Sequence, residues 1–174
     1  MHATLITPDD IQGLLPETAD LHVSLFDQWT GLRGVRPFPG LSSIQPETLK
    51  PWLGRINLLD VQRDPLDFCY RLYGSKLTQD SQYDLTGKLL SDLTDEQREI
   101  VQESYQTVVN DRKPLLTMVI PKEPWRDIAA YSRLILPFGD EPDMCERLLV
   151  LILRLSPDEM ERHRERMPLW YRFE

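Results

Sequence analysis

The residues of this chain that best suit the binding of a small molecule combine apolar bulk with single hydroxyl groups. Sites of this kind are usually apolar in bulk, with a few polar groups that fix the orientation of the ligand. The candidates are Tyr70, Leu72, Tyr83, Tyr105, Met118 and Ser132. We predict that they line one cavity, in which Tyr70 and Leu72 share a strand face because side chains alternate along a strand. The alternative is that Tyr105 and Met118 only fill the core.

Two arginines, Arg71 and Arg133, fall inside predicted strands and are further candidates for this site. An arginine in a strand must reach solvent, pair with a carboxylate or bind an anion, because its charge is costly to bury alone. If either arginine faces the cavity, we predict that the ligand is an anion, such as a carboxylate. The alternative is an exposed salt bridge between neighbouring strands.

The sequence lacks the common catalytic and metal-binding motifs that would indicate another chemistry. The cysteines, Cys69 and Cys145, share no metal-ligand spacing with His2, His22 or His163, so we predict neither a zinc site nor a disulfide framework. The sequence has no phosphate-binding Gly-x-x-x-x-Gly-Lys run, no Gly-x-Gly-x-x-Gly motif and no His-Glu-x-x-His pair. We interpret His163, within a charged segment, as a surface residue.

One enzymatic alternative stays open, a small α+β enzyme of the cyclase or isomerase type. Such an enzyme would use a carboxylate such as Asp60 or Asp84 as its base and Tyr70 as its acid. A cavity-facing carboxyl group with a raised pKa would be its signature.

Composition limits the classes of partner. The chain has 174 residues, with 20 Lys+Arg against 28 Asp+Glu and a net charge of −8, a length that favours one domain. An acidic surface repels phosphate groups at long range, so we expect neither nucleic acid nor an anionic membrane as the main partner. Because no segment has the pattern of a membrane span or a signal peptide, we expect a cytoplasmic protein.

The elements that must position these residues begin with an amphipathic helix at residues 16–33. Leu21, Leu25 and Trp29 recur at helical spacing and form an apolar stripe that needs a surface to cover. The hydrophobic period then changes to two. Residues 56–62 and 68–74 are predicted strands, and the loop at 63–67 has the length and turn residues of a hairpin connection.

The second half of the chain predicts a long helix and three more strands. Residues 75–93 are expected to form short helical turns and loops, and a capping box at Thr94 and Gln97 begins a helix at 94–110. Strands are predicted at 115–120, 128–137 and 147–155, the last apolar on both faces like a central strand. A charged helix from residue 156 and an aromatic tail at 167–173 follow, the tail docking on this chain or on a partner.

This order of elements describes a five-stranded antiparallel α+β domain. It carries the motifs Trp29-Thr-Gly-Leu-Arg33, Arg36-Pro-Phe-Pro39, Leu58-Leu-Asp-Val61, Phe68-Cys-Tyr-Arg-Leu-Tyr-Gly-Ser-Lys-Leu77, Asp84-Leu-Thr-Gly-Lys88, Arg112-Lys-Pro-Leu115 and Tyr131-Ser-Arg-Leu-Ile-Leu-Pro137. Through these motifs, which span about residues 25–155, the chain resembles the PAS sensor fold. It is most similar to the compact proteobacterial PAS family found as nearly free-standing single-domain proteins.

The resemblance implies a sheet of spatial order 2-1-5-4-3, with helices on one face that enclose a ligand cavity. It also implies an N-terminal extension at 1–54, a PAS-like domain at 55–155 and a charged helix with an aromatic tail at 156–174. The stripe of Leu21, Leu25 and Trp29 would form a homodimer interface in one version. In the other version it would cover the sheet of its own chain.

The resemblance further implies a non-enzymatic sensory or regulatory protein that binds a small molecule or a signalling partner and acts by changed association. Haem and flavin are disfavoured as cofactors, because helix 94–110 lacks an axial histidine and Cys69 lies inside a strand. The remaining rival is a ligand-free interaction scaffold, whose working surface would be the N-terminal helix or the aromatic tail.

Overall fold

The computed structural model describes residues 16–119 and 130–158, and their framework is a five-stranded antiparallel sheet. Its strands are β1 (Ile56–Gln62), β2 (Asp67–Leu72), β3 (Leu115–Val119), β4 (Ala130–Phe138) and β5 (Arg147–Leu155). The spatial order is β2-β1-β5-β4-β3, so β5 pairs with β1 on one side and with β4 on the other. The predicted fold class and strand order are therefore confirmed.

The main helices are α2 (Pro16–Arg33), α3 (Pro46–Leu49), α4 (Ser75–Ser81) and α5 (Asp95–Asp111). Short 3-10 turns lie at Leu41–Ser43, Lys50–Trp52 and Leu90–Asp92. The last of these and α4 agree with the short turns expected at residues 75–93. The predicted strand at 68–74 ends earlier, at Leu72, because the chain turns at Gly74, whose amide donates to Asn57 Oδ1. Most of the charged helix predicted from residue 156 and the whole of the aromatic tail lie outside the described residues.

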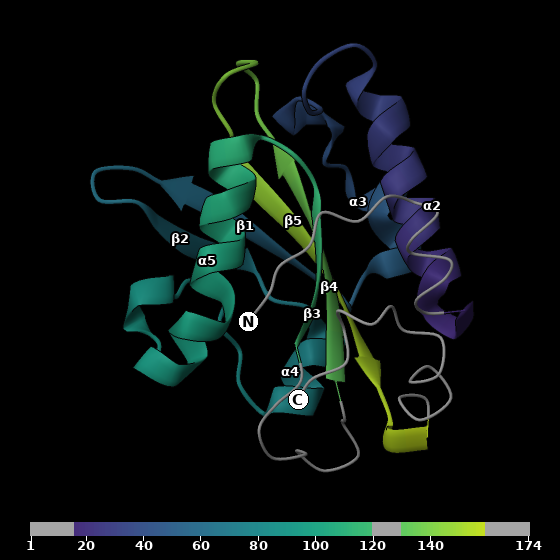
Figure 1. Ribbon diagram of the computed structural model, residues 1–174, viewed down its shortest axis with the longest axis vertical. Helices are drawn as coiled ribbons and strands as arrows, with labels where there is room; N and C mark the ends of the chain where they lie inside the picture. The colour runs from purple at the N-terminus through teal and green to yellow at the C-terminus, as the bar shows by residue number, and fades with distance from the viewer. Residues whose placement is uncertain (1–15, 120–129, 159–174) are drawn as a thin grey trace, which may run out of the picture.

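Helices α5 and α2 lie on opposite sides of the sheet (Figure 1). On one side, the Tyr105 ring of α5 packs against Phe68 of β2, with ring centroids 5.3 Å apart. On the other side, His22 of α2 hydrogen-bonds Ser132 of β4. We call these the α5 face and the α2 face of the sheet.

The core extends to both faces, which explains the apolar character of β5. Its residues Leu148, Leu149, Val150 and Leu151 are all fully buried. Because side chains alternate along a strand, two of the four pack toward α5 and the other two toward α2. Successive leucines and valines therefore have an apolar environment at every position of this stretch.

At Cys69 and Tyr70, the outer edge of β2 pairs with a short segment at residues 87–89. The Tyr70 amide donates to the Lys88 carbonyl, the Gly87 amide donates to the Tyr70 carbonyl, and Cys69 and Leu89 form an antiparallel bridge.

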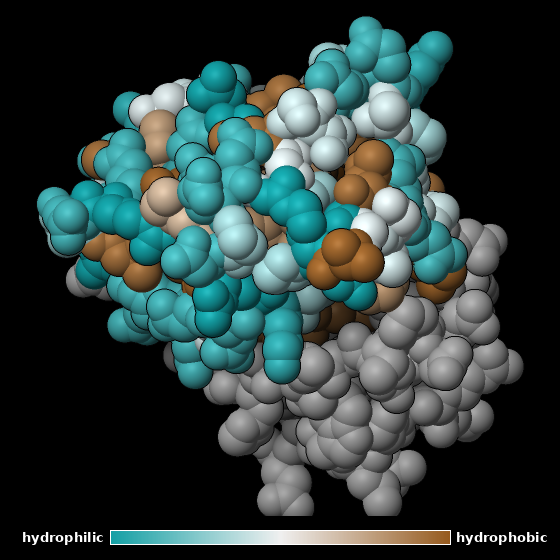
Figure 2. Space-filling view, turned by 90° about the horizontal axis from the view of Figure 1, so that it is seen from above, coloured by the Kyte–Doolittle hydropathy of each residue, from teal (hydrophilic) through white to brown (hydrophobic). Residues whose placement is uncertain are grey.

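Where the chain surface is seen from above, hydrophilic side chains dominate and the apolar ones are scattered between them (Figure 2). Scattered apolar residues of this kind are normal on a soluble surface.

Candidate functional site

A cluster of buried polar side chains lies on the α5 face of the sheet, around Arg133 of β4. Arg133 is only 3% exposed. Its Nε donates to Thr117 Oγ1 of β3 at 3.2 Å, and its Nη2 donates to Ser104 Oγ of α5 at 3.3 Å. Of the two arginines that the sequence proposes for the site, Arg133 is therefore the one that faces the interior.

Two phenol groups share this interior with Arg133. Tyr70 of β2 and Tyr105 of α5 are both buried. Burial raises the pKa of Tyr70 well above its ordinary value, and the neighbouring Tyr105 hydroxyl raises it further. Burial also raises the pKa of Tyr105, although Arg133 acts in the opposite direction. Both phenols thus stay neutral at physiological pH and serve as hydrogen-bonding groups beside a buried cation.

Burial lowers the pKa of Arg133, while the two phenols oppose the shift. The cluster therefore has the composition expected of an anion-binding interior: a guanidinium, hydroxyl groups and aromatic walls. Phe68 and Tyr73 extend the aromatic wall, since Tyr73 stacks edge-on against Tyr70 at 5.8 Å.

The other predicted cavity residues do not join this cluster. Ser132 precedes Arg133 in β4 and therefore points to the α2 face, where its hydroxyl lies 3.2 Å from His22 Nε2. Tyr83 is 63% exposed and Leu72 also lies at the surface. The backbone of Met118 pairs with Ser132, but its side chain lies outside the described part. The prediction of one cavity lined by all of these residues is wrong for Ser132, Tyr83 and Leu72.

Arg71 follows the alternative interpretation. Its Nη1 lies 2.9 Å from Asp60 Oδ2 on the neighbouring strand β1, in an exposed ion pair. The same carboxylate accepts a hydrogen bond from Arg147 Nε of β5 at 2.7 Å. Arg71 therefore belongs to a surface ion-pair network that joins three strands.

The two carboxylates proposed for an enzymatic mechanism are not next to Tyr70. Asp60 pairs with Cys69 in the strand register, and because side chains alternate it points to the sheet face opposite Tyr70. Asp84 is exposed, and hydrogen bonds from Thr86 lower the pKa of its carboxyl group. Neither residue therefore supplies the cavity-facing acid that this mechanism requires.

The apolar stripe of α2 covers the sheet of its own chain. Leu25 and Trp29 are buried, and Trp29 Nε1 donates to the Pro137 carbonyl of β4 at 2.9 Å. Leu21 is half-buried, and its carbonyl accepts a hydrogen bond from Trp52 Nε1. Of the two versions left open by the sequence, the structure contains the one in which the helix folds back. His22 also lies on this face, outside the α5-face cluster.

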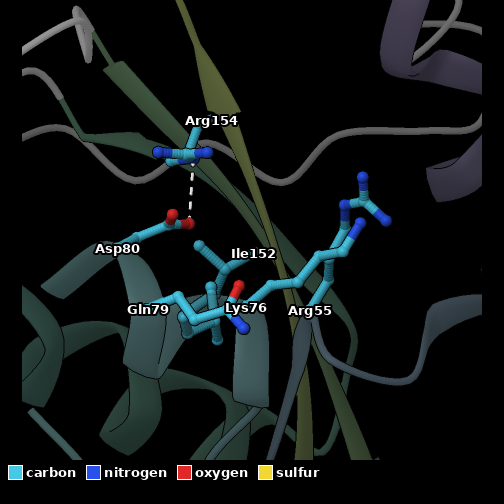
Figure 3. A pocket seen from close by; sticks show the side chains of 7 residues that line it. Arg55, Lys76, Gln79, Asp80, Ile152 and Arg154 are labelled. Carbon is cyan, nitrogen blue, oxygen red and sulfur yellow. Dashed lines mark ion pairs between the residues drawn. The ribbon is translucent and has the colours of Figure 1, made fainter. Parts of the chain in front are cut away.

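A pocket of about 230 Å³ opens beside α4, at the end of the α5 face (Figure 3). It is lined by Arg55, Lys76, Leu77, Gln79, Asp80, Ile152 and Arg154. Arg154 Nε lies 3.0 Å from Asp80 Oδ2. None of these residues was a candidate from the sequence, because they come from three separate segments. The available signal was another arginine in a predicted strand, Arg154.

Within residues 16–119 and 130–158, no group of three or more His, Cys, Asp and Glu side chains is arranged to hold a metal ion. Cys69 and Cys145 are free thiols. No helix in this described part is both long enough and apolar enough to cross a membrane.

Comparison with known proteins gives one positive finding. A family model described as a PAS domain matches residues 18–153, which cover most of α2, the whole of β1 to β4 and most of β5. No curated protein matches the sequence.

Proposed function

The chain belongs to the PAS domain family, and on this premise we propose that it is a sensory domain that signals by changing its association with another protein. PAS domains have sensory or regulatory roles in general and are typically not enzymes. We propose further that a change inside the domain reaches its surface through a change in the position of α2.

The observation that carries this proposal is the placement of two successive residues in β4. Arg133 contacts Ser104 of α5 on one face of the sheet, and Ser132 contacts His22 of α2 on the other. A shift of β4 in response to a change around Arg133 therefore alters the surface on which α2 rests. Packed interiors pass on such displacements because they contain few voids.

The proposed output is a population shift of α2 between a docked and a released state. In the docked state, Leu25 and Trp29 are buried against the sheet. In the released state, these side chains and the sheet surface beneath them become available to another chain. That chain is a signalling partner or a second copy of this protein, which would use the same stripe for an isologous contact.

Hydrogen exchange measured by mass spectrometry tests this mechanism. We expect amides of α2 to exchange at least roughly tenfold faster than those of β5, because α2 opens without global unfolding. Ser104→Ala, a change on the α5 face, should accelerate exchange in α2 as well as in α5. Thr107→Ala is the matched control, since the Thr107 hydroxyl donates to the Glu103 carbonyl of its own helix. Equal protection of α2 and β5, with no response to Ser104→Ala, would refute the proposal.

A ligand-free interaction scaffold is the second candidate. The observation that favours it is the burial of side chains beneath and within α5, where Phe68, Tyr105 and Val108 are each at most 1% exposed. Native mass spectrometry of the purified protein separates the two candidates. A retained small-molecule mass supports a ligand-binding sensor, whereas a ligand-free dimer supports the scaffold.

A further inference from the structure

The pocket beside α4 gathers positive charge in a chain whose net charge is negative. Arg55, Lys76 and Arg154 line it together with a single carboxylate, Asp80, whereas the whole chain carries a net charge of −8. The cations come from the segment before β1, from α4 and from β5. A concave site with this local charge attracts small anions out of proportion to the overall charge of the protein.

The backbone holds these three segments in fixed relation. The Ile152 amide of β5 donates to the Arg55 carbonyl at 2.9 Å, and the Lys76 amide of α4 donates to the Gly54 carbonyl at 2.9 Å. Arg55 is thereby tied to β5, and its neighbour Gly54 is tied to α4. The pocket is thus formed by ordered elements and does not depend on one long side chain.

The charges lie on two sides of an apolar floor. In the close view, Arg154 and Asp80 lie on one side of Ile152, and Arg55 and the Lys76 side chain extend toward the other (Figure 3). Leu77, which is buried, adds to the apolar part of the lining. A ligand that fits this pattern carries two anionic groups separated by a short hydrocarbon chain.

We propose that this pocket binds a short-chain organic dicarboxylate. One carboxylate meets Arg55 and Lys76, and the other meets Arg154, whose planar guanidinium is suited to paired hydrogen bonds with a carboxylate. The methylene groups between them lie over Ile152 and Leu77. A volume of about 230 Å³ suits a ligand of this small size, since sites for larger ligands occupy about 300–1,000 Å³.

Asp80 has a defined part in this proposal. Its ion pair with Arg154 occupies the group that a ligand carboxylate needs, so the ligand must compete with Asp80. The Arg154 side chain in this pair is 46% exposed, and exposed pairs are weak enough to be displaced. Ligand binding therefore separates α4 from β5. The next residue of β5 after Ile152 is Leu153, which is buried and whose carbonyl accepts a hydrogen bond from Ser132 on the α2 face. If the proposed function holds, this pocket is where the sensor binds its ligand. Ligand binding can be measured independently of any change in α2.

Isothermal titration calorimetry with succinate tests the proposal, with butyrate and inorganic phosphate as comparison ligands. Succinate and butyrate have the same chain length but differ by one carboxylate. We expect saturable binding of succinate at one site, weakened by salt, and butyrate binding weaker by roughly tenfold or more. Absence of succinate binding at about 10 mM would overturn the proposal. Tighter binding of phosphate than of succinate would also overturn it, because a single-centred anion does not need two separated cationic groups.

Variants of the lining residues make the test specific. Arg55→Gln and Arg154→Gln should each weaken succinate binding by roughly tenfold, whereas Asp80→Asn should strengthen it by removing the competing carboxylate. Arg71→Gln is the matched control, since Arg71 also forms an exposed ion pair with an aspartate but lies away from the pocket. Equal affinities of the Arg154→Gln variant and the wild type would refute the assignment. Unchanged melting temperatures would show that the variants fold. If succinate binds as expected but does not change hydrogen exchange in α2, only the signalling mechanism is refuted.

Discussion

Trp29→Ala is the sharpest test of the packing of α2 on the sheet. Trp29 is only 3% exposed, its Nε1 donates to the Pro137 carbonyl at 2.9 Å, and its ring stacks with Phe26 at 5.9 Å. Truncation of a buried tryptophan costs about 3–5 kcal/mol through lost burial and the cavity left behind. For a chain of this length, we expect the melting temperature to fall by roughly 10 °C. Urea denaturation followed by circular dichroism measures the free energy of unfolding directly.

Two further variants separate the causes of this loss. Trp29→Phe keeps most of the aromatic surface but leaves the Pro137 carbonyl without its donor, so we expect a cost of about 1–2 kcal/mol. Leu32→Ala is the control on the same helix, because Leu32 is 42% exposed and its loss should change the free energy of unfolding by at most about 0.5 kcal/mol. If Trp29→Ala destabilised the protein no more than Leu32→Ala does, the reasoning that Trp29 fixes α2 to the sheet would fail.

The other predictions concern the Cys145 thiol and two glycines, all outside the candidate sites. Burial raises the pKa of the Cys145 thiol to about 11 from 9.0, so at about pH 8 iodoacetamide should label Cys69 well before Cys145; equal labelling of the two in the native protein would contradict this. Because the folded pKa is the higher one, the stability contributed by neutral Cys145 is complete below pH 9.0 and declines as the pH rises toward about 11. Gly74→Ala should destabilise by at least about 2 kcal/mol, since its Cβ would lie 2.8 Å from the Gly54 carbonyl carbon. Gly31→Ala, in open space on α2, should instead stabilise by about 0.5–1 kcal/mol; urea denaturation of both variants checks the pair, and a similar effect of the two would refute the steric argument.

The sequence predicted the framework well because hydrophobic period and turn residues act locally. Alternation identified the β1–β2 hairpin, and the doubly apolar run of β5 correctly indicated a central strand covered on both faces. The helix predicted at 94–110 was found at Asp95–Asp111. In each case, the signal lay within one element and its immediate neighbours.

The composition of the site was harder to predict because it depends on which face each strand residue occupies. Ser132 and Arg133 both looked suitable by residue type, yet alternation must place one of them on each face. Nothing within β4 tells which of the two points toward α5, because that choice depends on the register with the other strands. The same reasoning applies to Arg71 and Arg133, of which one is exposed and one buried.

The pocket beside α4 was missed for a different reason. Arg55, Lys76 and Arg154 lie far apart in the sequence and share no motif. They come together because β1 and β5 are neighbours in the sheet and α4 begins against Gly54. Only the tertiary fold creates this site.

The segment at residues 87–89 has a consequence for the behaviour of the protein at high concentration. A sheet margin with unoccupied amide and carbonyl groups can recruit strands from other molecules and start aggregation. Along β2, Tyr70 already satisfies both its amide and its carbonyl within the chain. Before a strand from another molecule can pair with Tyr70, residues 87–89 must detach from β2. Resistance to self-assembly at this margin therefore depends on the stability of one short contact.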